Sequence, residues 1–330
     1  MLNNNFTNII RKSVFGIVLA GLLIASPLSA QEERFTIQKK GSDKAMLNPA
    51  PWSGYWWDRK SGGIIDSFKV YDAAVEKKTG KNPGATAWES DQRNGHYDPA
   101  GPNWAGHCNG WAAAAILEPE PKTSKTYQGF TFSTANQKAL LSEMYMDCYA
   151  EFYGKRKNNN FPLSSDIRPD LFHRLLVDNI KMKKRGIVAD TSFNSPVWNY
   201  PIYGYEMTWK NTPLIPFQIE VSTKVFFADD GVDIHFLGTK TFTKDYHYYL
   251  YTNLKGEVIR GEWDVRSQFD HPDFVWVPTG DSPARGTGEN PCIHPQFVHE
   301  ITGRSGGSDT DENIDAIVTE SGLNPNELFN

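Results

Sequence analysis

The sequence predicts an α+β fold, in which a short helix packs on an antiparallel sheet and the C-terminal part is rich in β-structure. Residues 108–118 and 133–153 carry helix formers with start and stop signals. From residue 214 onward, apolar and polar residues alternate as they do in half-buried strands. The chain has 330 residues, enough for one large domain or two medium ones.

The first thirty residues have the pattern of an export signal. Arg11 and Lys12 precede the apolar stretch Ser13–Ala25, and small Ala30 stands just before the charged segment QEERF. The apolar stretch is too short to span a bilayer comfortably, so a permanent anchor is the weaker interpretation. We therefore expect residues 1–30 to be a signal peptide cleaved near Ala30, and the mature protein to be extracellular or periplasmic.

Composition divides the rest of the chain into three parts. Residues 31–95 are rich in Gly, Pro and Trp and predict an N-terminal segment packed on the core. Residues 96–280 hold the predicted helices and strands of the core. Residues 281–330 predict a turn-rich tail with a short helix, and no internal repeat is evident.

The first predicted helices have clear ends. Four alanines at 112–115 favour a helix that the Pro119-Glu-Pro segment stops. The next helix, 133–153, has Ser133 or Thr134 as candidate N-cap. The segment FHRLLVDNI that begins at Phe172 fits a helix or a strand, because a short apolar run does not decide between them.

Strands dominate the second half of the predicted core. The segment RGIVAD (185–190) has the composition of a strand, and alternation from 214 continues around the turn DDG at 229–231. A hairpin follows, with its turn at NLKG (253–256).

Charge and cysteine content restrict the partners and the redox chemistry. A net charge of −5, with one basic cluster at 181–185, argues against nucleic acid as a partner. Three cysteines are an odd number for an exported protein, so at least one thiol is free or pairs outside the chain. Cys148 and Cys292 are candidates for a disulfide that leaves Cys108 free, although spacing alone does not establish the pairing.

Cys108 is the candidate nucleophile. It lies in WAGHCNGWAAAA, where a Gly-containing loop enters a helix. A thiol at a helix N-terminus faces free N–H groups and the positive end of the helix dipole, which favour the thiolate and can stabilise an oxyanion. The alternative, a small buried hydrophobic cysteine, fits the polar and turn-like surroundings less well.

A nucleophilic thiol needs a base and a group that orients the base. His173 is followed by Asp190 at the end of GIVAD. If both residues lie on neighbouring strands, they are close to opposite one another, and the carboxylate can fix the imidazole tautomer. If His173 is helical, tertiary packing must bring them together.

A second histidine competes with His173. His247 would face Glu262 or Asp264 across the predicted hairpin. His235 is a weaker candidate, and His107 adjoins the nucleophile and has at most a supporting role. Spacing leaves His173 and His247 nearly equal.

Several segments together resemble the transglutaminase elicitor family of oomycetes and marine bacteria. Its V-W-N-x-P-x-x-G-[FY] motif is matched by Val197, Trp198, Asn199, Pro201, Gly204 and Tyr205. GHCNGWAAAAILEPEP, DIRPDLFHRLL, IVAD and GEW…HPDFVW also resemble family motifs, and they occur in the family's order. The resemblance covers about residues 95–280.

The resemblance implies a protein-glutamine γ-glutamyltransferase (transglutaminase, an acyltransferase) with a papain-like cysteine transamidase core. The family pattern places the nucleophile at Cys108, the histidine at His173 and the aspartate at Asp190, which favours His173 over His247. The implied substrates are proteins that carry glutamine, with lysine or another primary amine as acceptor. The family activity also implies calcium dependence.

Further site residues are expected around this triad. The backbone N–H of Cys108 and a donor from Asn103 or Trp104 are candidates for the oxyanion hole. Trp198 and Asn199 are expected to pack beside the site and hold Asp190. The runner-up function is a cysteine peptidase or peptidoglycan amidase with the same triad, and a third is a secreted binding protein that has lost the chemistry.

No calcium site follows from the sequence. The acidic segment SDTDENID (308–315) lacks the Gly and Glu of an EF-hand loop, and Asp229, Asp230 and Asp233 form another carboxylate-rich turn. Both have ordinary explanations as solvated segments, so the metal ligands stay unknown.

Overall fold

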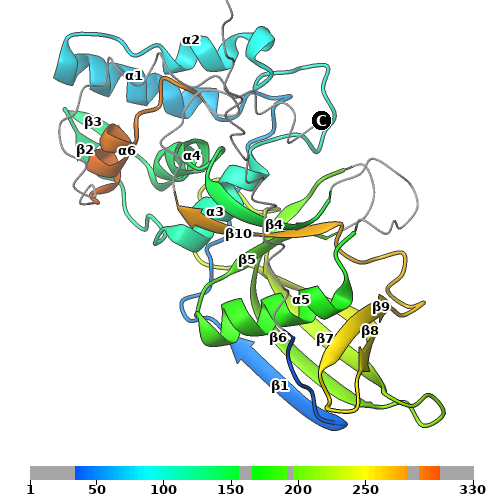
Figure 1. Cartoon of the computed structure of the whole chain (residues 1–330). Helices are drawn as coiled ribbons and strands as arrows, with labels where there is room; N and C mark the ends of the chain where they lie inside the picture. Colours follow the sequence, from blue (N-terminus) through cyan, green and yellow to red (C-terminus); the bar gives the residue numbers. More distant parts are fainter. Residues whose placement is uncertain (1–33, 156–165, 192–195, 281–289, 305–330) are drawn as a thin grey trace, which may run out of the picture. The chain divides into compact units, whose positions relative to one another are not determined.

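An antiparallel sheet forms the framework of the protein in the computed structural model, which describes residues 34–155, 166–191, 196–280 and 290–304 (Figure 1). Within these residues the sheet has eight strands in the order β4-β10-β5-β6-β7-β8-β9, with β1 paired to β6. The strands are β1 (Lys40–Met46), β4 (Tyr149–Gly154), β5 (Ile187–Asp190), β6 (Asn199–Asn211), β7 (Gln218–Ala228), β8 (Thr241–Thr252), β9 (Val258–Trp263) and β10 (Phe274–Gly280).

Strand β6 pairs with β5 along its first residues and with β1 along the following ones. Its first residues, from Asn199 to Ile202, pair with β5, and the stretch from Gly204 to Lys210 pairs with β1. All four residues of β5 are buried, since α3 contacts this strand and the π-helical segment η2 (Leu176–Met182) also contacts it. A strand covered on both faces is consistent with the unbroken apolar run IVA.

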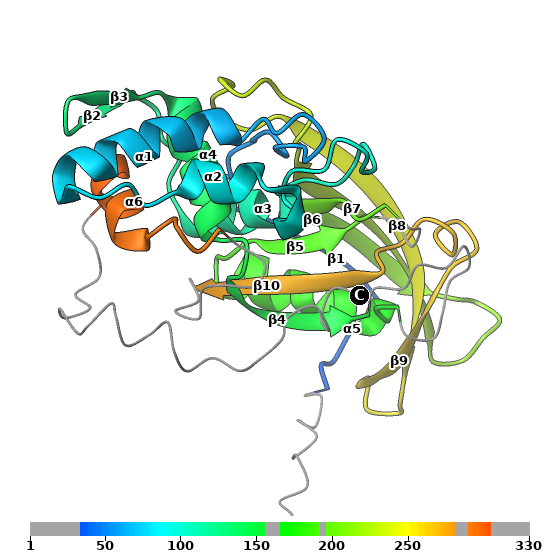
Figure 2. The same ribbon diagram turned by 90° about the horizontal axis from the view of Figure 1, so that it is seen from above.

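Most helices group together beside one end of the sheet (Figures 1 and 2). Helix α4 contacts α1, α3 and α6, whereas α5 continues into η2 and packs against β8 and β9. The helices are α1 (Ile65–Thr79), α2 (Ala85–Ser90), the 3-10 turn η1 (Gln92–Asn94), α3 (Cys108–Leu117), α4 (Thr134–Met144), α5 (Pro169–Leu175) and α6 (Pro295–Thr302); β2 (Lys125–Tyr127) and β3 (Phe130–Phe132) form a small hairpin.

The buried apolar residues form two clusters. The helical cluster contains the alanines of α3, Trp111 and residues of α1 and α4. The sheet cluster contains Phe172, Leu176 and residues from β5 to β10. Phe172, directly before His173, lies in the sheet cluster, whereas the alanines that follow Cys108 lie in the helical cluster.

Several predicted elements are confirmed and others are corrected. Helix α3 begins at Cys108 and ends before Pro119, and Ser133 caps α4 through a hydrogen bond to the backbone N–H of Asn136. Helix α4 stops at Met144, and the rest of the predicted helix turns into β4, which pairs with β10. The ambiguous segment from Phe172 is helical, so it is not a strand opposite Asp190.

The chain divides into two units, Met1–Arg34 and Phe35–Asn330, and the helices and strands named above belong to the second. The N-terminal segment 31–95 contributes β1 to the sheet and α1 to the helices. The predicted signal peptide lies outside the described residues, as does most of the tail.

Neither a membrane-spanning helix nor a disulfide is found where the structure is described. No helix there has the length and apolar character needed to cross a bilayer. The structure contains no disulfide between Cys148 and Cys292, so the pairing considered for them is not formed.

Candidate active site

Cys108 is the first residue of α3, with its side chain only 6% exposed. Two glycines let the backbone approach closely on either side of it. A Cβ at Gly106 would lie 2.4 Å from the carbonyl oxygen of Trp56, and a Cβ at Gly110 would lie 2.0 Å from that of Ser142. The glycines therefore allow the start of α3 to pack closely between the segment around Trp56 and helix α4.

The nearest polar atoms to the Cys108 sulfur come from β6 and the residues just before it. The Asn199 Nδ2 atom lies 3.6 Å from Sγ, and the Val197 carbonyl oxygen lies 4.0 Å from it. The Asn199 Oδ1 atom accepts a hydrogen bond of 2.9 Å from the indole N–H of Trp276 on β10. Because the oxygen is engaged by Trp276, the amide N–H₂ of Asn199 is the group directed at the sulfur.

Asp190 is held beside Asn199. The two residues are direct partners in the β5–β6 ladder, and Asp190 Oδ1 accepts a hydrogen bond of 3.1 Å from the backbone N–H of Trp198. Asp190 is fully buried. The VWN segment thus contacts Asp190 through both Trp198 and Asn199.

Three half-buried aromatic side chains line the same region. Trp198 packs edge-on against Trp56 and stacks on Tyr200, with ring centroids 6.4 Å apart in both pairs. Such partly exposed rings offer apolar surface to the aliphatic part of a substrate side chain.

A second carboxylate, that of Asp230, acts electrostatically on the Cys108 sulfur. Asp230 lies just beyond the end of β7, is 3% exposed and interacts with the Tyr200 hydroxyl. Burial, together with the charge of Asp229, raises the pKa of Asp230 to about 7. Burial also raises the pKa of the Cys108 thiol, and the charges of Asp230 and Asp190 raise it further, against the hydrogen bonds from Asn199. The resting sulfur is thus favoured as a thiol, which a nearby base must deprotonate.

The structure does not bring His173 to Cys108. His173 lies in α5, its Nδ1 atom is 2.9 Å from the Tyr248 hydroxyl, and its ring stacks on Phe35. These partners belong to the sheet cluster, whereas the alanines that follow Cys108 belong to the helical cluster. The expected contact between His173 and Asp190 is also replaced by the contacts of Asp190 with Trp198 and Asn199.

Burial of His173 leads to a prediction about acid stability. Burial lowers its pKa to about 4 from an ordinary value of 6.5. Below the ordinary value the unfolded chain binds more protons than the folded one, so stability is lost as the pH falls from 6.5 to 4. We expect the free energy of unfolding to fall by about 3 kcal/mol through this residue. Urea unfolding at pH 7 and pH 4 should show this loss in the wild type and a smaller one in His173→Gln; equal losses would contradict the assignment.

The other predicted site residues are His247, Asn103 and Trp104. His247 on β8 has its Nδ1 atom 3.0 Å from the Ser222 hydroxyl on β7. Asn103 is exposed and accepts a hydrogen bond from Lys60, and Trp104 packs against the helical cluster. Among the described residues, the hydrogen-bond partners of the Cys108 sulfur are Val197 and Asn199, so Asn199 takes the position near the sulfur that was expected of Asn103 or Trp104.

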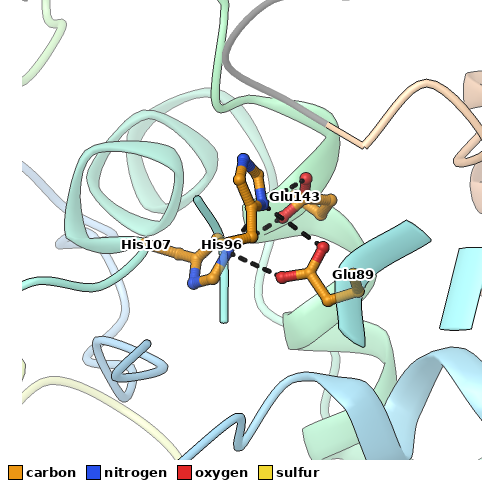
Figure 3. A group of neighbouring side chains, drawn as sticks. All are labelled: Glu89, His96, His107 and Glu143. Carbon is orange, nitrogen blue, oxygen red and sulfur yellow. Dashed lines mark hydrogen bonds and ion pairs between the residues drawn. The ribbon is translucent and has the colours of Figure 1, made fainter. Parts of the chain in front are cut away.

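Four buried polar residues that the sequence analysis did not group lie directly behind the start of α3. They are Glu89 from α2, His96, His107 and Glu143 from α4, and their ligand atoms all lie within 4.8 Å of one another (Figure 3). Burial opposes ionisation of Glu89, but its interactions with the neighbouring His107 and His96 lower its pKa to about 2, whereas burial raises the pKa of Glu143. In the sequence, the one indication of this group is His107, directly before Cys108.

The described residues offer no set of ligands that fits calcium. Asp229 binds Lys240 and the backbone N–H of Gly231, and Asp233 accepts from the backbone N–H of His235, so these carboxylates do not converge. The Glu89 group supplies two nitrogens, whereas calcium takes six to eight oxygens. The segment 308–315 lies outside the described residues.

Comparison with known proteins identifies the family. The transglutaminase elicitor family model matches residues 79–232 and 231–291. The fold is similar to the crystal structure of the GP42 transglutaminase from Phytophthora sojae, with a TM-score of 0.63 and 21% identity, over 81% of this chain and 92% of that one. No curated protein sequence matches the chain. Because the family match spans most of the chain, including Cys108, Asp190 and Asn199, the protein belongs to the transglutaminase elicitor family.

Proposed function

We propose that this protein is a secreted protein-glutamine γ-glutamyltransferase with a papain-like arrangement, in which Cys108 carries the acyl group. The observation that supports this most strongly is the Asn199 amide directed at a cysteine sulfur at the start of a helix, in a member of the transglutaminase elicitor family. The export pattern in residues 1–30 supports secretion. The substrates are proteins that present glutamine, with a lysine ε-amine as acceptor.

The reaction proceeds through a thioester. The Cys108 thiol loses its proton to a base, and the thiolate attacks the γ-carboxamide carbon of glutamine. The C–N bond of the tetrahedral intermediate breaks, ammonia leaves with a proton returned by the base, and the acyl group stays on sulfur. A lysine amine then attacks the thioester, the C–S bond breaks, and an isopeptide bond forms; water in its place gives glutamate.

Helix α3 and Asn199 stabilise the oxyanion of each tetrahedral intermediate. The first backbone N–H groups of a helix have no partners within the helix, and Cys108 stands at this position. The Asn199 amide adds a side-chain donor whose orientation Trp276 fixes. Together they provide preformed dipoles where the negative charge develops.

Replacement of Asn199 tests this role. We expect Asn199→Ala to lower kcat by about a hundredfold to a thousandfold, the usual cost of losing an oxyanion donor. Asn103→Ala should change kcat by less than about threefold, because Asn103 is exposed and bonds Lys60. Steady-state amine incorporation with both variants, checked for folding by thermal unfolding, measures the difference. If Asn103→Ala were the more damaging change, the oxyanion assignment would move back to residues 103–104.

The base is the part of the predicted triad for which burial and charge around the sulfur favour another residue. The sequence and the family pattern predict His173, but its ring is engaged by Tyr248 and Phe35. Asp230 acts electrostatically on Cys108 and has a pKa near 7, which suits a general base at neutral pH. We therefore assign proton transfer to Asp230, and Asp190 keeps the Trp198 backbone in place beside the sulfur.

The proposed function is tested by following both products of the reaction. Wild-type protein should incorporate a fluorescent primary amine into a glutamine-bearing protein such as casein and release ammonia in step. A strict peptidase or amidase would incorporate no amine, and a protein that only binds would release neither product. Either result would reject the transferase assignment.

A further inference from the structure

The buried group behind the nucleophile helix has the geometry of a metal site. The His107 Nε2 atom lies 3.3 Å from a carboxylate oxygen of Glu89, 3.3 Å from one of Glu143 and 3.4 Å from His96 Nδ1 (Figure 3). His96 Nδ1 lies 3.2 Å from the other carboxylate oxygen of Glu89, Oε2, and 3.6 Å from the other oxygen of Glu143, Oε1. Ligand atoms bound at about 2.0–2.1 Å to a tetrahedral ion lie about 3.4 Å apart. One ligand atom from each of the four residues lies within 4.8 Å of the others, so the carboxylates need to turn only slightly toward a central ion to complete such a shell.

Hydrogen bonding among the four side chains does not account for this arrangement. His107 Nδ1 lies 2.8 Å from the Trp57 carbonyl oxygen, which only accepts, so Nδ1 carries a proton. One further proton on Nε2 points in one direction, yet Nε2 faces Glu89, Glu143 and His96 at nearly equal distances. In agreement, Glu89 Oε1 and Glu143 Oε2 are buried with no hydrogen-bond partner among the described residues.

The surroundings of the group are those of a metal shell. The histidine that ligates a metal commonly donates its other N–H to a backbone carbonyl, as His107 does to Trp57. Ligating carboxylates are in turn hydrogen-bonded, and Asn290 donates its backbone N–H to Glu143 and its side-chain amide to Glu89. Two carboxylates also neutralise the charge of one divalent cation, which removes the cost of burying unpaired charges.

We propose that Glu89, His96, His107 and Glu143 bind one divalent transition-metal ion, with zinc as the best match to two nitrogen and two oxygen ligands in a closed tetrahedral site. All four side chains are at most 4% exposed, so the site has no open position for a substrate. The ion is structural. It ties α2, the segment after η1 and α4 to His107, the residue that caps α3 directly before Cys108.

Metal analysis and thermal unfolding of the full-length chain test the proposal. Protein freed of metal with a chelator should take up one equivalent of zinc, measured by mass spectrometry of the elements after dialysis. Zinc should then raise Tm by about 5–10 °C, as expected for a ligand present far above its Kd. Cobalt(II) in the same site should give the intense visible absorption of tetrahedral coordination. Failure of the wild type to retain either metal, with Tm unchanged, would overturn the proposal.

Matched variants separate a metal site from a buried ion-pair network. The double variant Glu89→Gln, His96→Gln should lose zinc uptake and the zinc-dependent rise in Tm. His271→Gln alters another buried histidine–carboxylate pair, with Asp166, and should keep both. Asn290→Ala should weaken zinc binding by about tenfold, as loss of an outer-shell partner does. If the double variant bound zinc as the wild type does, the four residues would not be the ligands.

Discussion

Cys108→Ala is expected to abolish amine incorporation, with a loss of about a thousandfold or more in kcat. No other group is placed to form the thioester: Asn199 and the backbone N–H groups of α3 stabilise charge but cannot accept an acyl group. The substitution removes one sulfur atom from a small buried side chain, so the fold should survive. The measurement is steady-state incorporation of a fluorescent amine, with Tm recorded for each protein.

The other two cysteines provide the control for this prediction. Cys148 and Cys292 are partly buried and pack against the helical cluster. Cys148→Ala and Cys292→Ala should keep incorporation within about twofold of the wild type. Retention of activity in Cys108→Ala, or its loss in one of these two controls, would remove Cys108 from the mechanism.

Asp230→Asn is expected to lower kcat by about a hundredfold to ten-thousandfold, the range that general-base catalysis contributes. Asparagine has nearly the shape of aspartate but cannot take the thiol proton. Because the pKa of Asp230 is about 7, wild-type kcat should rise as the pH rises through 7 and then level off. The charged and titratable groups that act on Asp230 are Asp229, Lys240, Tyr200 and Cys108. The variant should lack the rise near pH 7.

Stability measurements separate the catalytic role of Asp230 from a structural one. A raised pKa means that the folded protein holds a proton that the unfolded chain releases, so stability falls as the pH rises from 3.8 to about 7. Asp230→Asn should therefore be at least as stable as the wild type at pH 8, while its kcat is lost. If Asp230→Asn stayed active and His173→Gln, although folded, lost kcat, the base would be His173 as the sequence predicts.

Local signals predicted the start of the nucleophile helix and the neighbourhood of Asp190. Four consecutive alanines and the proline after Glu118 define α3 without help from the rest of the fold. The VWN segment could be placed beside Asp190 because two strands connected by a short segment tend to pair, and Asp190 indeed pairs with Asn199. Both predictions rest on neighbours in sequence.

The position of His173 could not be predicted from its neighbours in sequence. A short apolar run does not distinguish a helix from a strand, and here the run forms α5 and the π-helical segment η2. Its position then depends on packing against β8 and β9, which are far along the chain. Even a correct helix prediction would not show whether the His173 ring packs against the helical cluster or the sheet cluster.

The Glu89–His96–His107–Glu143 group and β1 were missed for a related reason. The four polar residues come from two helices and two loop positions, with gaps in sequence that match no standard metal motif. Strand β1 has several charged residues, and its exposed and half-buried residues alternate. It forms only because β6 extends beyond β5 and leaves an edge to pair with. In both cases the residues come together only in the folded chain, so no pattern in the sequence reveals the feature.

The most direct test of the account is to find which sulfur becomes acylated. The protein is incubated with a peptide in which the glutamine amide is replaced by a chloromethyl ketone of the same shape, and the modified residue is located by peptide mass spectrometry. We predict a single adduct on Cys108, despite its burial, and its loss when excess glutamine peptide competes. An adduct on the more exposed Cys148 or Cys292, with Cys108 unmodified, would contradict the central claim.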